Sequence, residues 1–348
     1  MVRRGFGRFL PGAAAAALLA SCSPGGPETH APTASSAYFP VQRCINLANA
    51  LNAPNEGDWG YTITEQDLQR IAGAGFDTVR VLVDWHSHAL ETPPFMVDPA
   101  YFARIDEVIA QSFAAGLTVI IDMHNYEDIY SDPRGHRDRA IAIWRQIAEH
   151  YADYPQGLIF ELVNEPRDVL EGALWEAMAA DLVRAVRESN PVRTIVLGGD
   201  NWSSLWGLQR LHLPEDPYLV ATFHYYEPYD FTHQGGDWFE DPPPLGAPWG
   251  APEERDQLRE HMNTAGAWAA ENRTPVFLGE FGAFHKANAV DRAAWTQAMR
   301  EGAEANGMGW CYFDYAAGFD AFDREQQRWL PEIVAALDTA GSPPALRR

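Results

Sequence analysis

Two glutamates stand where short apolar runs of the sequence end, in the segments Asn164-Glu165-Pro166 and Glu280-Phe281-Gly282. A pair of carboxyl groups suits the hydrolysis of a glycosidic bond, because one acid protonates the leaving oxygen while the other carboxylate attacks the anomeric carbon. The acid then needs a raised pKa, and the nucleophile must stay ionised. A single glutamate at such a place is as often a salt-bridge partner, so the surrounding residues must decide between the two interpretations.

Further polar side chains stand at comparable places in the sequence. Arg80 lies within another apolar run, and two more runs end in His124-Asn125-Tyr126 and His224-Tyr225-Tyr226. In a barrel of parallel strands, the C-terminal ends of all strands converge on one rim. Carboxylates, imidazoles and a guanidinium that gather at one rim favour an active site over isolated salt bridges.

The elements that must position these groups are eight apolar runs of strand length, which alternate with amphipathic segments after residue 40. Val79–Val83 and Leu117–Ile121 are almost continuously apolar, which is typical of parallel strands buried on both faces. The alternation predicts the α/β class and a single (β/α)8 TIM barrel. Strands are expected at Val41–Leu47, Asp77–Val83, Leu117–His124, Leu158–Asn164, Arg193–Gly199, Leu219–Tyr225, Pro275–Glu280 and Gly309–Tyr315.

Between the strands, the pattern predicts amphipathic helices. The first has a start similar to a capping box, with Thr64 followed three residues later by Asp67. The segment Glu227–Pro252 is rich in Trp, Gly and Pro and predicts an elaborated loop after the sixth strand. Helices are expected at Thr64–Ala74, Tyr101–Ala115, Ala140–Tyr151, Leu174–Ser189, Glu253–Glu271, Asp291–Asn306 and Gln326–Leu337.

Composition narrows the class of ligand. The chain has 348 residues, 46% of them hydrophobic, which is enough for a barrel core. With 26 basic and 48 acidic side chains its net charge is −22, which argues against nucleic acid and disfavours polyanionic substrates. The 12 tryptophans are compatible with a plain core, and they also suit a protein that grips flat, uncharged ligands.

The N-terminus has the pattern of an export signal. Three arginines precede a short apolar run, Ala13–Ala20, and Leu19-Ala20-Ser21-Cys22 resembles the bacterial lipobox, in which the chain is cut before a cysteine that becomes lipidated. The alternative is an ordinary signal peptide with an incidental cysteine. The lipobox interpretation predicts an exported lipoprotein, anchored to the membrane through Cys22 on the periplasmic face or the cell surface.

These features predict four segments. Residues 1–21 would be the lipoprotein signal peptide, and residues 22–38, rich in Pro, Gly, Ser and Thr, a flexible tether. Residues 39–340 would form the catalytic barrel, and residues 341–348 a frayed tail.

Cysteine and histidine pairs leave two questions open. Cys44 and Cys311 fall on the first and last expected strands, so they could form a disulfide in an exported protein or remain two buried thiols. His86 and His88 form a His-x-His pair, but the sequence places no third ligand beside them. We therefore expect no metal and no other cofactor.

The chain resembles the family 5 glycoside hydrolases, most closely bacterial endo-β-1,4-glucanases, some of which also cut mannans. The resemblance runs from about Arg43 to Leu337. The segments that carry it are Arg43–Leu51, Ala53–Gly60, Val163–Pro166, Phe223–Tyr226, Phe231–Gly235 and Leu278–Gly282.

The resemblance implies a retaining double displacement on a β-1,4-linked polysaccharide, with Glu165 as acid/base and Glu280 as nucleophile. It implies that Asn164 contacts the sugar 2-hydroxyl and that Arg80 and Tyr226 hold the nucleophile. The other substrate-binding positions that it implies are Asn49, His124, Asn125, His224, His233, Trp238 and Phe313.

Some positions depart from the family pattern. Phe313 replaces a tryptophan platform, Asn125 a second histidine and Asn52 a glutamate, while Leu82 and Asp84 replace the usual Pro and Arg. Three of these changes touch the sugar subsite next to the bond being cut, so the substrate stays open. It is expected to be a cellulose-like glucan or glucomannan, or else another β-linked glycan such as mannan or short oligosaccharides. A lipid-anchored sugar-binding protein without turnover is the third alternative, against which the presence of both glutamates argues.

Overall fold

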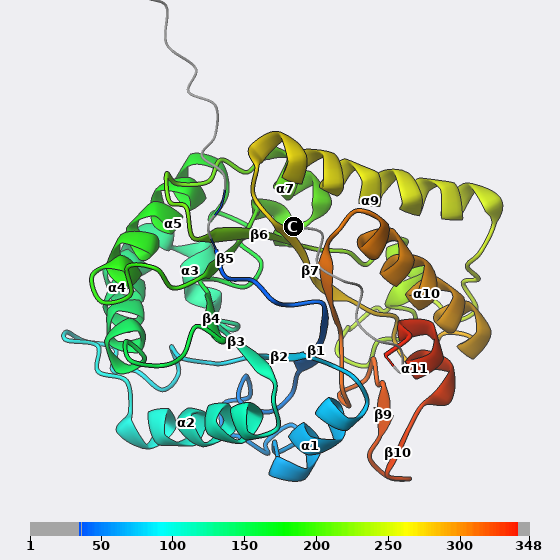
Figure 1. Cartoon of the computed structure of the whole chain (residues 1–348), viewed down its shortest axis with the longest axis horizontal. Helices are drawn as coiled ribbons and strands as arrows, with labels where there is room; N and C mark the ends of the chain where they lie inside the picture. Colours follow the sequence, from blue (N-terminus) through cyan, green and yellow to red (C-terminus); the bar gives the residue numbers. More distant parts are fainter. Residues whose placement is uncertain (1–34, 36, 340–348) are drawn as a thin grey trace, which may run out of the picture. The chain divides into compact units, whose positions relative to one another are not determined.

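The structure is a computed structural model, which describes residue 35 and residues 37–339. Eight parallel strands pair in the order of the sequence, and the last strand pairs with the first to close a barrel (Figure 1). The predicted (β/α)8 TIM barrel is therefore confirmed. The strands are β1 Arg43–Leu47, β2 Thr78–Val81, β3 Thr118–Asp122, β4 Leu158–Glu161, β5 Ile195–Gly198, β6 Leu219–His224, β7 Val276–Phe281 and β8 Gly309–Tyr312.

Helices surround the strands and cover their outer face (Figure 1). They are α1 Glu65–Gly73, α2 Pro99–Ala114, α3 Glu127–Ser131, α4 Pro133–His150, α5 Gly172–Arg187, α6 Asp200–Ser203, α7 Leu205–Arg210, α8 Tyr229–Thr232, α9 Pro252–Asn272, α10 Ala289–Ala305 and α11 Pro331–Leu337. Thr64 caps α1 in a reciprocal capping box with Asp67, as its sequence predicts. None of the helices in the described part of the chain is both long and apolar enough to cross a bilayer.

Several helix predictions need correction: α4 begins at Pro133 instead of Ala140, and α3 was not expected. The expected helix Gln326–Leu337 is wrong in its first part, where β10 (Arg328–Trp329) pairs with β9 (Phe322–Asp323) and α11 begins only at Pro331. Proline restricts the preceding residue to extended backbone and suits the first helical position, which explains the late start. After β5, where no helix was expected, the chain forms the short helices α6 and α7.

The barrel interior at the N-terminal end of the strands is apolar. Phe39 contacts Phe277 there with ring centroids 5.3 Å apart, so the segment before β1 covers this end of the barrel. A buried cluster from the strands fills the layer above it, and its members are Val41, Cys44, Ile120, Ile159, Val196, Val220, Phe277 and Cys311. The opposite end of the barrel is left for polar groups.

Cys44 and Cys311 form a disulfide between β1 and β8. The two residues are direct partners in the register of these strands, and both are fully buried. Of the two alternatives that the sequence left open, the structure therefore contains the disulfide, which joins the strands at the seam of the barrel.

Removing this disulfide is expected to lower the free energy of unfolding by about 2–5 kcal/mol, because the cross-link joins residues 267 positions apart and restricts the unfolded chain. The measurement is denaturant unfolding of the wild type and of a Cys44→Ala, Cys311→Ala variant, each with and without reductant. The wild type should lose stability on reduction and the variant should not respond. A wild type whose unfolding midpoint is the same after full reduction would contradict a stabilising role.

Candidate active site

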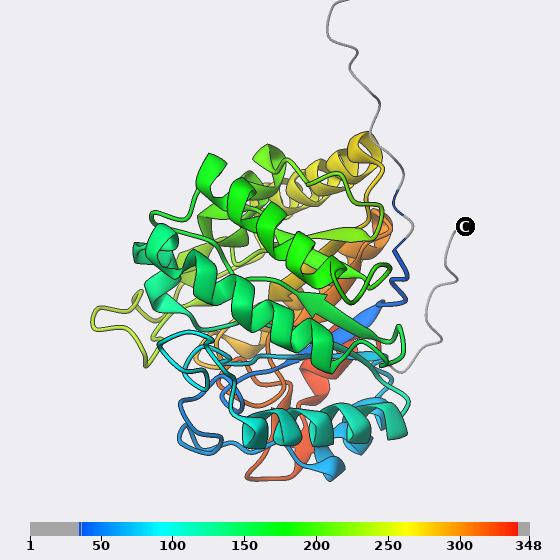
Figure 2. The same ribbon diagram turned by 90° about the vertical axis from the view of Figure 1, so that its left-hand side faces the viewer.

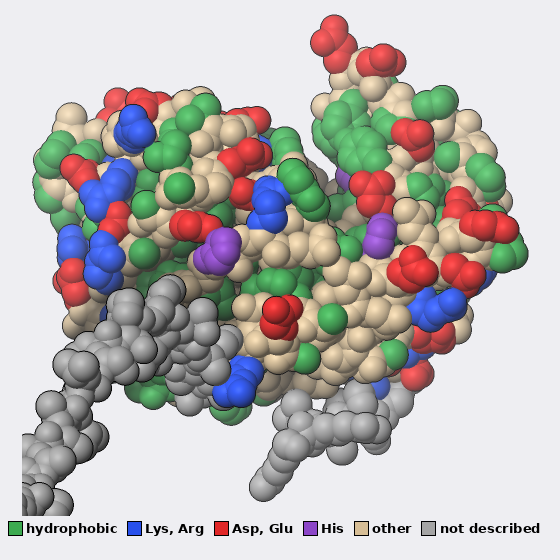
Figure 3. Space-filling view, turned by 90° about the horizontal axis from the view of Figure 1, so that it is seen from above, with side chains coloured by type: hydrophobic (Ala, Val, Ile, Leu, Met, Phe, Trp, Pro, Cys, Tyr) green, Lys and Arg blue, Asp and Glu red, His purple; other side chains and the backbone are tan. Residues whose placement is uncertain are grey.

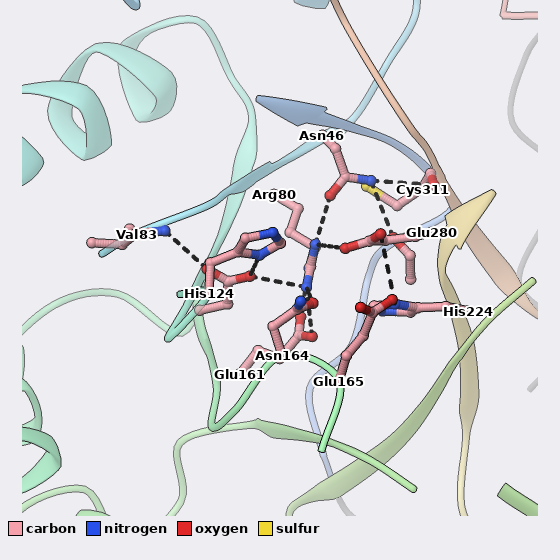
Figure 4. A network of polar contacts seen from close by, with 12 residues as sticks. Asn46, Arg80, Val83, His124, Glu161, Asn164, Glu165, His224, Glu280 and Cys311 are labelled. Carbon is pink, nitrogen blue, oxygen red and sulfur yellow. Dashed lines mark hydrogen bonds and ion pairs between the residues drawn. The ribbon is translucent and has the colours of Figure 1, made fainter. Parts of the chain in front are cut away.

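Glu165 and Glu280 lie at the C-terminal rim of the barrel, with His224 next to both (Figure 4). His224 Nδ1 is 2.8 Å from Glu165 Oε1 and 3.6 Å from Glu280 Oε2. One carboxylate oxygen of each glutamate lies within 4.8 Å of the other. This spacing fits the separation of about 5–5.5 Å between carboxyl groups in retaining glycosidases, which is shorter than inverting enzymes need.

Arg80 is the centre of a buried polar network behind these glutamates (Figure 4). Its guanidinium contacts Glu280 Oε1 at 2.7 Å, Glu161 at 2.8 and 2.9 Å, Asp122 Oδ2 at 2.9 Å, Asn164 Oδ1 at 2.8 Å and Asn46 Oδ1 at 2.9 Å. One fixed positive charge thus faces three buried carboxylates. Since buried charges are costly unless paired and hydrogen-bonded, this network fixes Arg80 in one position against Glu280.

The surroundings of Glu280 keep its carboxylate ionised. Burial alone would raise its pKa, but the charges of His224, Arg80 and His124 lower it, and the pKa falls to about 2 with the help of a hydrogen bond from Tyr226. The Tyr226 hydroxyl donates to Glu280 Oε2 at 2.9 Å. Burial and the nearby Glu280 carboxylate raise the pKa of Tyr226, so this phenol keeps its proton and remains a donor.

The two rim histidines are each held by a carboxylate. His124 Nδ1 lies 2.8 Å from Asp122 Oδ2, which orients its ring beside Arg80. Burial would lower the pKa of His224, but Glu280 and Glu165 raise it above the ordinary value. A protonated His224 can therefore stand between the two glutamates and reduce their repulsion.

The backbone on both sides of the rim is locally strained. Glu165 has a φ of 49° and Asn49, after β1, a φ of 60°, which are unusual for residues other than glycine. The carbonyl of Asn164 accepts a hydrogen bond of 2.5 Å from the Tyr130 hydroxyl, which helps to hold this turn. Strain of this kind is commonly kept where it positions functional side chains.

The two asparagines that depart from the family pattern bind each other. Asn125 Nδ2 donates to the carbonyl of Asn52 at 2.7 Å, and the Asn52 side chain accepts from the amide of Ala50 at 3.2 Å. Asn125 thus lies at the rim as expected, but one of its amide protons is already donated to another residue of the protein. Asn52 is buried, so of these two asparagines only Asn125 has surface available to a ligand.

An aromatic wall follows β6 and β8. Phe319 is its centre, with ring centroids 5.4 Å from Phe313, 5.6 Å from His233 and 5.7 Å from Trp238. Phe313 is half-buried and Trp238 is 52% exposed, so both offer ring surface to a ligand. Burial lowers the pKa of His233 to about 4, so this ring is neutral at pH 7.

The segment between β6 and α9, which carries His233 and Trp238, projects from the barrel as the yellow-green loop in Figure 2. Figure 3 shows a deep notch in the surface beside a projecting lobe with hydrophobic side chains on its inner wall. A surface of this shape can accommodate an extended, uncharged chain.

Several residues of the site were not expected from the sequence. Asn46, Asp122 and Glu161 hold Arg80. The sequence signal that could have indicated them is a polar residue inside an otherwise apolar strand. Trp202, on α6, is 53% exposed, its amide donates to the carbonyl of Pro166 at 3.1 Å, and Arg167 covers one face of its ring at 4.3 Å. Trp202 therefore lies beside the turn that carries Glu165.

The His-x-His pair does not form a metal site in the described part of the chain. His86 stacks on Tyr126 and His88 on Tyr101, with ring centroids 4.7 and 3.7 Å apart. Within residues 37–339, only the Glu165, His224 and Glu280 group has ligand atoms spaced for an ion.

A parallel barrel with two facing glutamates at its C-terminal rim, one of them held ionised by a buried arginine, defines a glycoside hydrolase of the TIM-barrel class. Residues 40–318 match the family model of the cellulases, glycosyl hydrolase family 5. The chain belongs to this family.

Named relatives agree with this assignment. Endoglucanase H of Acetivibrio thermocellus is 30% identical over 328 residues, and Endoglucanase A of Ruminococcus albus is 29% identical over 326 residues. The matches cover 92% and 83% of this chain, but 35% of Endoglucanase H and 87% of Endoglucanase A. Thermotoga maritima Cel5A, in a structure with cellobiose, superposes with a TM-score of 0.84 at 36% identity, over 85% of this chain and 97% of that one. Cel5A has also been solved with mannotriose.

Proposed function

We propose that this protein is a retaining endo-β-1,4-glucanase that cleaves cellulose-like glucan or glucomannan. The observation that carries the proposal is the buried Glu280, which Arg80 and Tyr226 hold ionised within 4.8 Å of Glu165. The family relatives named as endoglucanases and the complexes of Cel5A with cellobiose and mannotriose support the substrate class.

In the first step, a Glu280 oxygen attacks the anomeric carbon while Glu165 donates a proton to the leaving glycosidic oxygen. Arg80 and Tyr226 keep the attacking carboxylate in place, and Asn164, itself fixed by Arg80, is available to the sugar 2-hydroxyl. In the second step, Glu165 removes a proton from water, which attacks the anomeric carbon and releases Glu280. The product then has the configuration of the substrate.

His124, His224, Asn49 and Asn125 surround the reacting sugar in this proposal. His233, Trp238 and Phe313 belong to the aromatic wall, on which the apolar face of a sugar ring can pack. Phe313 offers less ring surface than a tryptophan, so we expect a weaker grip at the reacting subsite.

A second candidate substrate is another β-linked glycan, such as mannan or a short oligosaccharide. The partly exposed Asn125 favours it, because a neutral amide makes different contacts with a sugar from the histidine of the family pattern. A sugar-binding protein without turnover would have no chemical use for the paired glutamates and the arginine behind them.

The function is tested by incubating the purified protein with β-glucan, carboxymethylcellulose, glucomannan, mannan and cello-oligosaccharides. We expect internal cleavage, seen as a rapid fall in viscosity with little reducing sugar, and NMR should show the β-anomer as the first product. A first product with the α-configuration would contradict the retaining mechanism. Activity on mannan alone would select the second candidate.

Membrane attachment through Cys22 is a separate part of the proposal, and Cys22 lies outside the described residues together with the signal peptide, most of the tether and the tail. We expect the wild type in the membrane fraction and a Cys22→Ala variant in the soluble exported fraction, because the variant has no thiol to lipidate. The measurement is fractionation followed by immunoblotting. A wild type that is equally soluble would show that the lipobox interpretation is wrong.

A further inference from the structure

Besides Trp202 and Trp238, Trp206 is a further exposed tryptophan near the rim, and the catalytic steps above do not use it. It lies in the first turn of α7, and 59% of its surface is exposed. Exposed aromatic residues occur singly on many proteins, so exposure alone does not define a binding site. The attachment of Trp206 to the rim and the covering of its ring are the informative features.

The segment that carries Trp206 is attached to the active site through Ser204. Ser204 forms an isolated parallel bridge with His224, the residue that contacts Glu165. The Ser204 hydroxyl also caps α7, because it accepts a hydrogen bond from the amide of Gly207 at 3.1 Å. Trp202 lies two residues before Ser204 and Trp206 two residues after it. The two tryptophans therefore flank the residue through which this segment joins the rim.

The backbone of this segment is held in an unusual conformation. Asn201, Trp202 and Ser203 have φ values of 53°, 63° and 48°, in the left-handed region that favours glycine. Three consecutive residues of this kind are costly and persist only where the surroundings impose them. The hydrogen bond from the Trp202 amide to Pro166 and the bridge at Ser204 are such constraints.

One face of the Trp206 ring is covered and fixed. The guanidinium of Arg210 lies over the ring, 3.3 Å from its centroid, and forms an ion pair with Asp200. A ring that is stacked on one face and still more than half exposed has its other face open to solvent. Because the stacking restricts the ring before a ligand arrives, binding on the open face loses less conformational freedom.

The charges around the ring indicate an uncharged ligand. Arg210 is neutralised by Asp200, so it offers no free cation to an anionic ligand, and the chain as a whole has a net charge of −22. The apolar faces of pyranose rings pack on aromatic rings without any charge. Trp206 follows Trp202 by four residues, so the segment of α6 and α7 carries two exposed rings.

We propose that Trp206, backed by Arg210, is a binding platform for a β-linked glucan chain that continues past Trp202 from the Glu165 side of the active site. The inference rests on the proposed function, and it deepens that function, since it adds a contact that only a polymer or a long oligosaccharide can reach. Short substrates occupy the catalytic glutamates without reaching this ring.

The test compares Trp206→Ala and Trp206→Phe with the wild type on soluble β-glucan and on an aryl β-cellobioside. For Trp206→Ala we expect kcat/KM on the polymer to fall about three- to tenfold, mainly through KM, with the aryl glycoside unchanged. Trp206→Phe should recover part of the loss. Affinity electrophoresis in a glucan-containing gel measures binding without turnover when each protein also carries Glu280→Gln. Retardation by the glucan should be strongest with Trp206, weaker with Trp206→Phe and weakest with Trp206→Ala.

Tyr38→Ala is the matched control, because Tyr38 is also a largely exposed aromatic residue, 54% exposed, but lies just before the strand end that faces away from the rim. It should behave as the wild type on both substrates. If kcat/KM of Trp206→Ala falls equally on both substrates, or does not fall on the polymer, the platform proposal is overturned while the glucanase assignment stays intact. A wild type that cleaves no β-1,4-glucan would overturn the proposed function, and the platform with it.

Discussion

Replacing Glu280 with alanine is expected to reduce hydrolysis by about 10⁴-fold or more, because the reaction loses the atom that forms the glycosyl-enzyme bond. Azide should restore turnover in this variant. Alanine leaves space on the face of the sugar from which Glu280 attacks, and azide entering there displaces the leaving group in one step, with Glu165 still able to protonate it. The product should be the glycosyl azide of inverted, α-configuration, identified by NMR.

Glu165→Ala is the informative counterpart. An activated aryl glycoside needs little protonation of its leaving group, so this variant should still form the glycosyl-enzyme on Glu280. Azide then attacks that intermediate without a general base, and the product should be the β-glycosyl azide. Identical azide products from both variants would contradict the assignment of nucleophile and acid/base. A Glu280→Ala variant with full activity would place the nucleophile elsewhere.

Replacing Arg80 with methionine should cause the largest loss of stability. Without the guanidinium, three buried carboxylates would lose this positive partner, those of Asp122, Glu161 and Glu280. Removing one partner of a buried ion pair costs about 3–5 kcal/mol of stability. Denaturant unfolding at pH 7.5 should show this fall, and activity should fall with it, because Glu280 loses a 2.7 Å contact.

The loss should depend on pH in a definite direction. Unpaired buried carboxylates have pKa values above those in the unfolded chain, so the folded variant binds more protons than the unfolded one, and its deficit shrinks as the pH is lowered toward 5. Arg145→Met is the control, since Arg145 pairs with Glu188 on the surface and should cost less than about 1 kcal/mol at either pH. Two results would contradict a stabilising role of the buried network: equal losses of unfolding free energy in the two variants, or a loss in Arg80→Met that grows as the pH is lowered.

The barrel could be predicted from the sequence because each strand is an apolar run. The paired glutamates could be predicted because both stand at the ends of such runs. The sequence could not show the partners of Arg80. Asp122 and Glu161 are neighbours through the register of β3 on β4, and the residues of one strand do not reveal how it aligns with the next. Trp202 was missed for a different reason, since its place depends on three left-handed residues that no periodicity predicts.

The bond between Cys44 and Cys311 turns the intervening chain into a covalent ring. All the residues from β2 to β7 lie within this ring, and so do both glutamates and the loop that projects after β6. A protease that cuts this loop once would leave a single joined molecule instead of releasing a fragment. A nicked protein would therefore run as one species on a non-reducing gel and as two after reduction, and its barrel strands would stay in each other's vicinity.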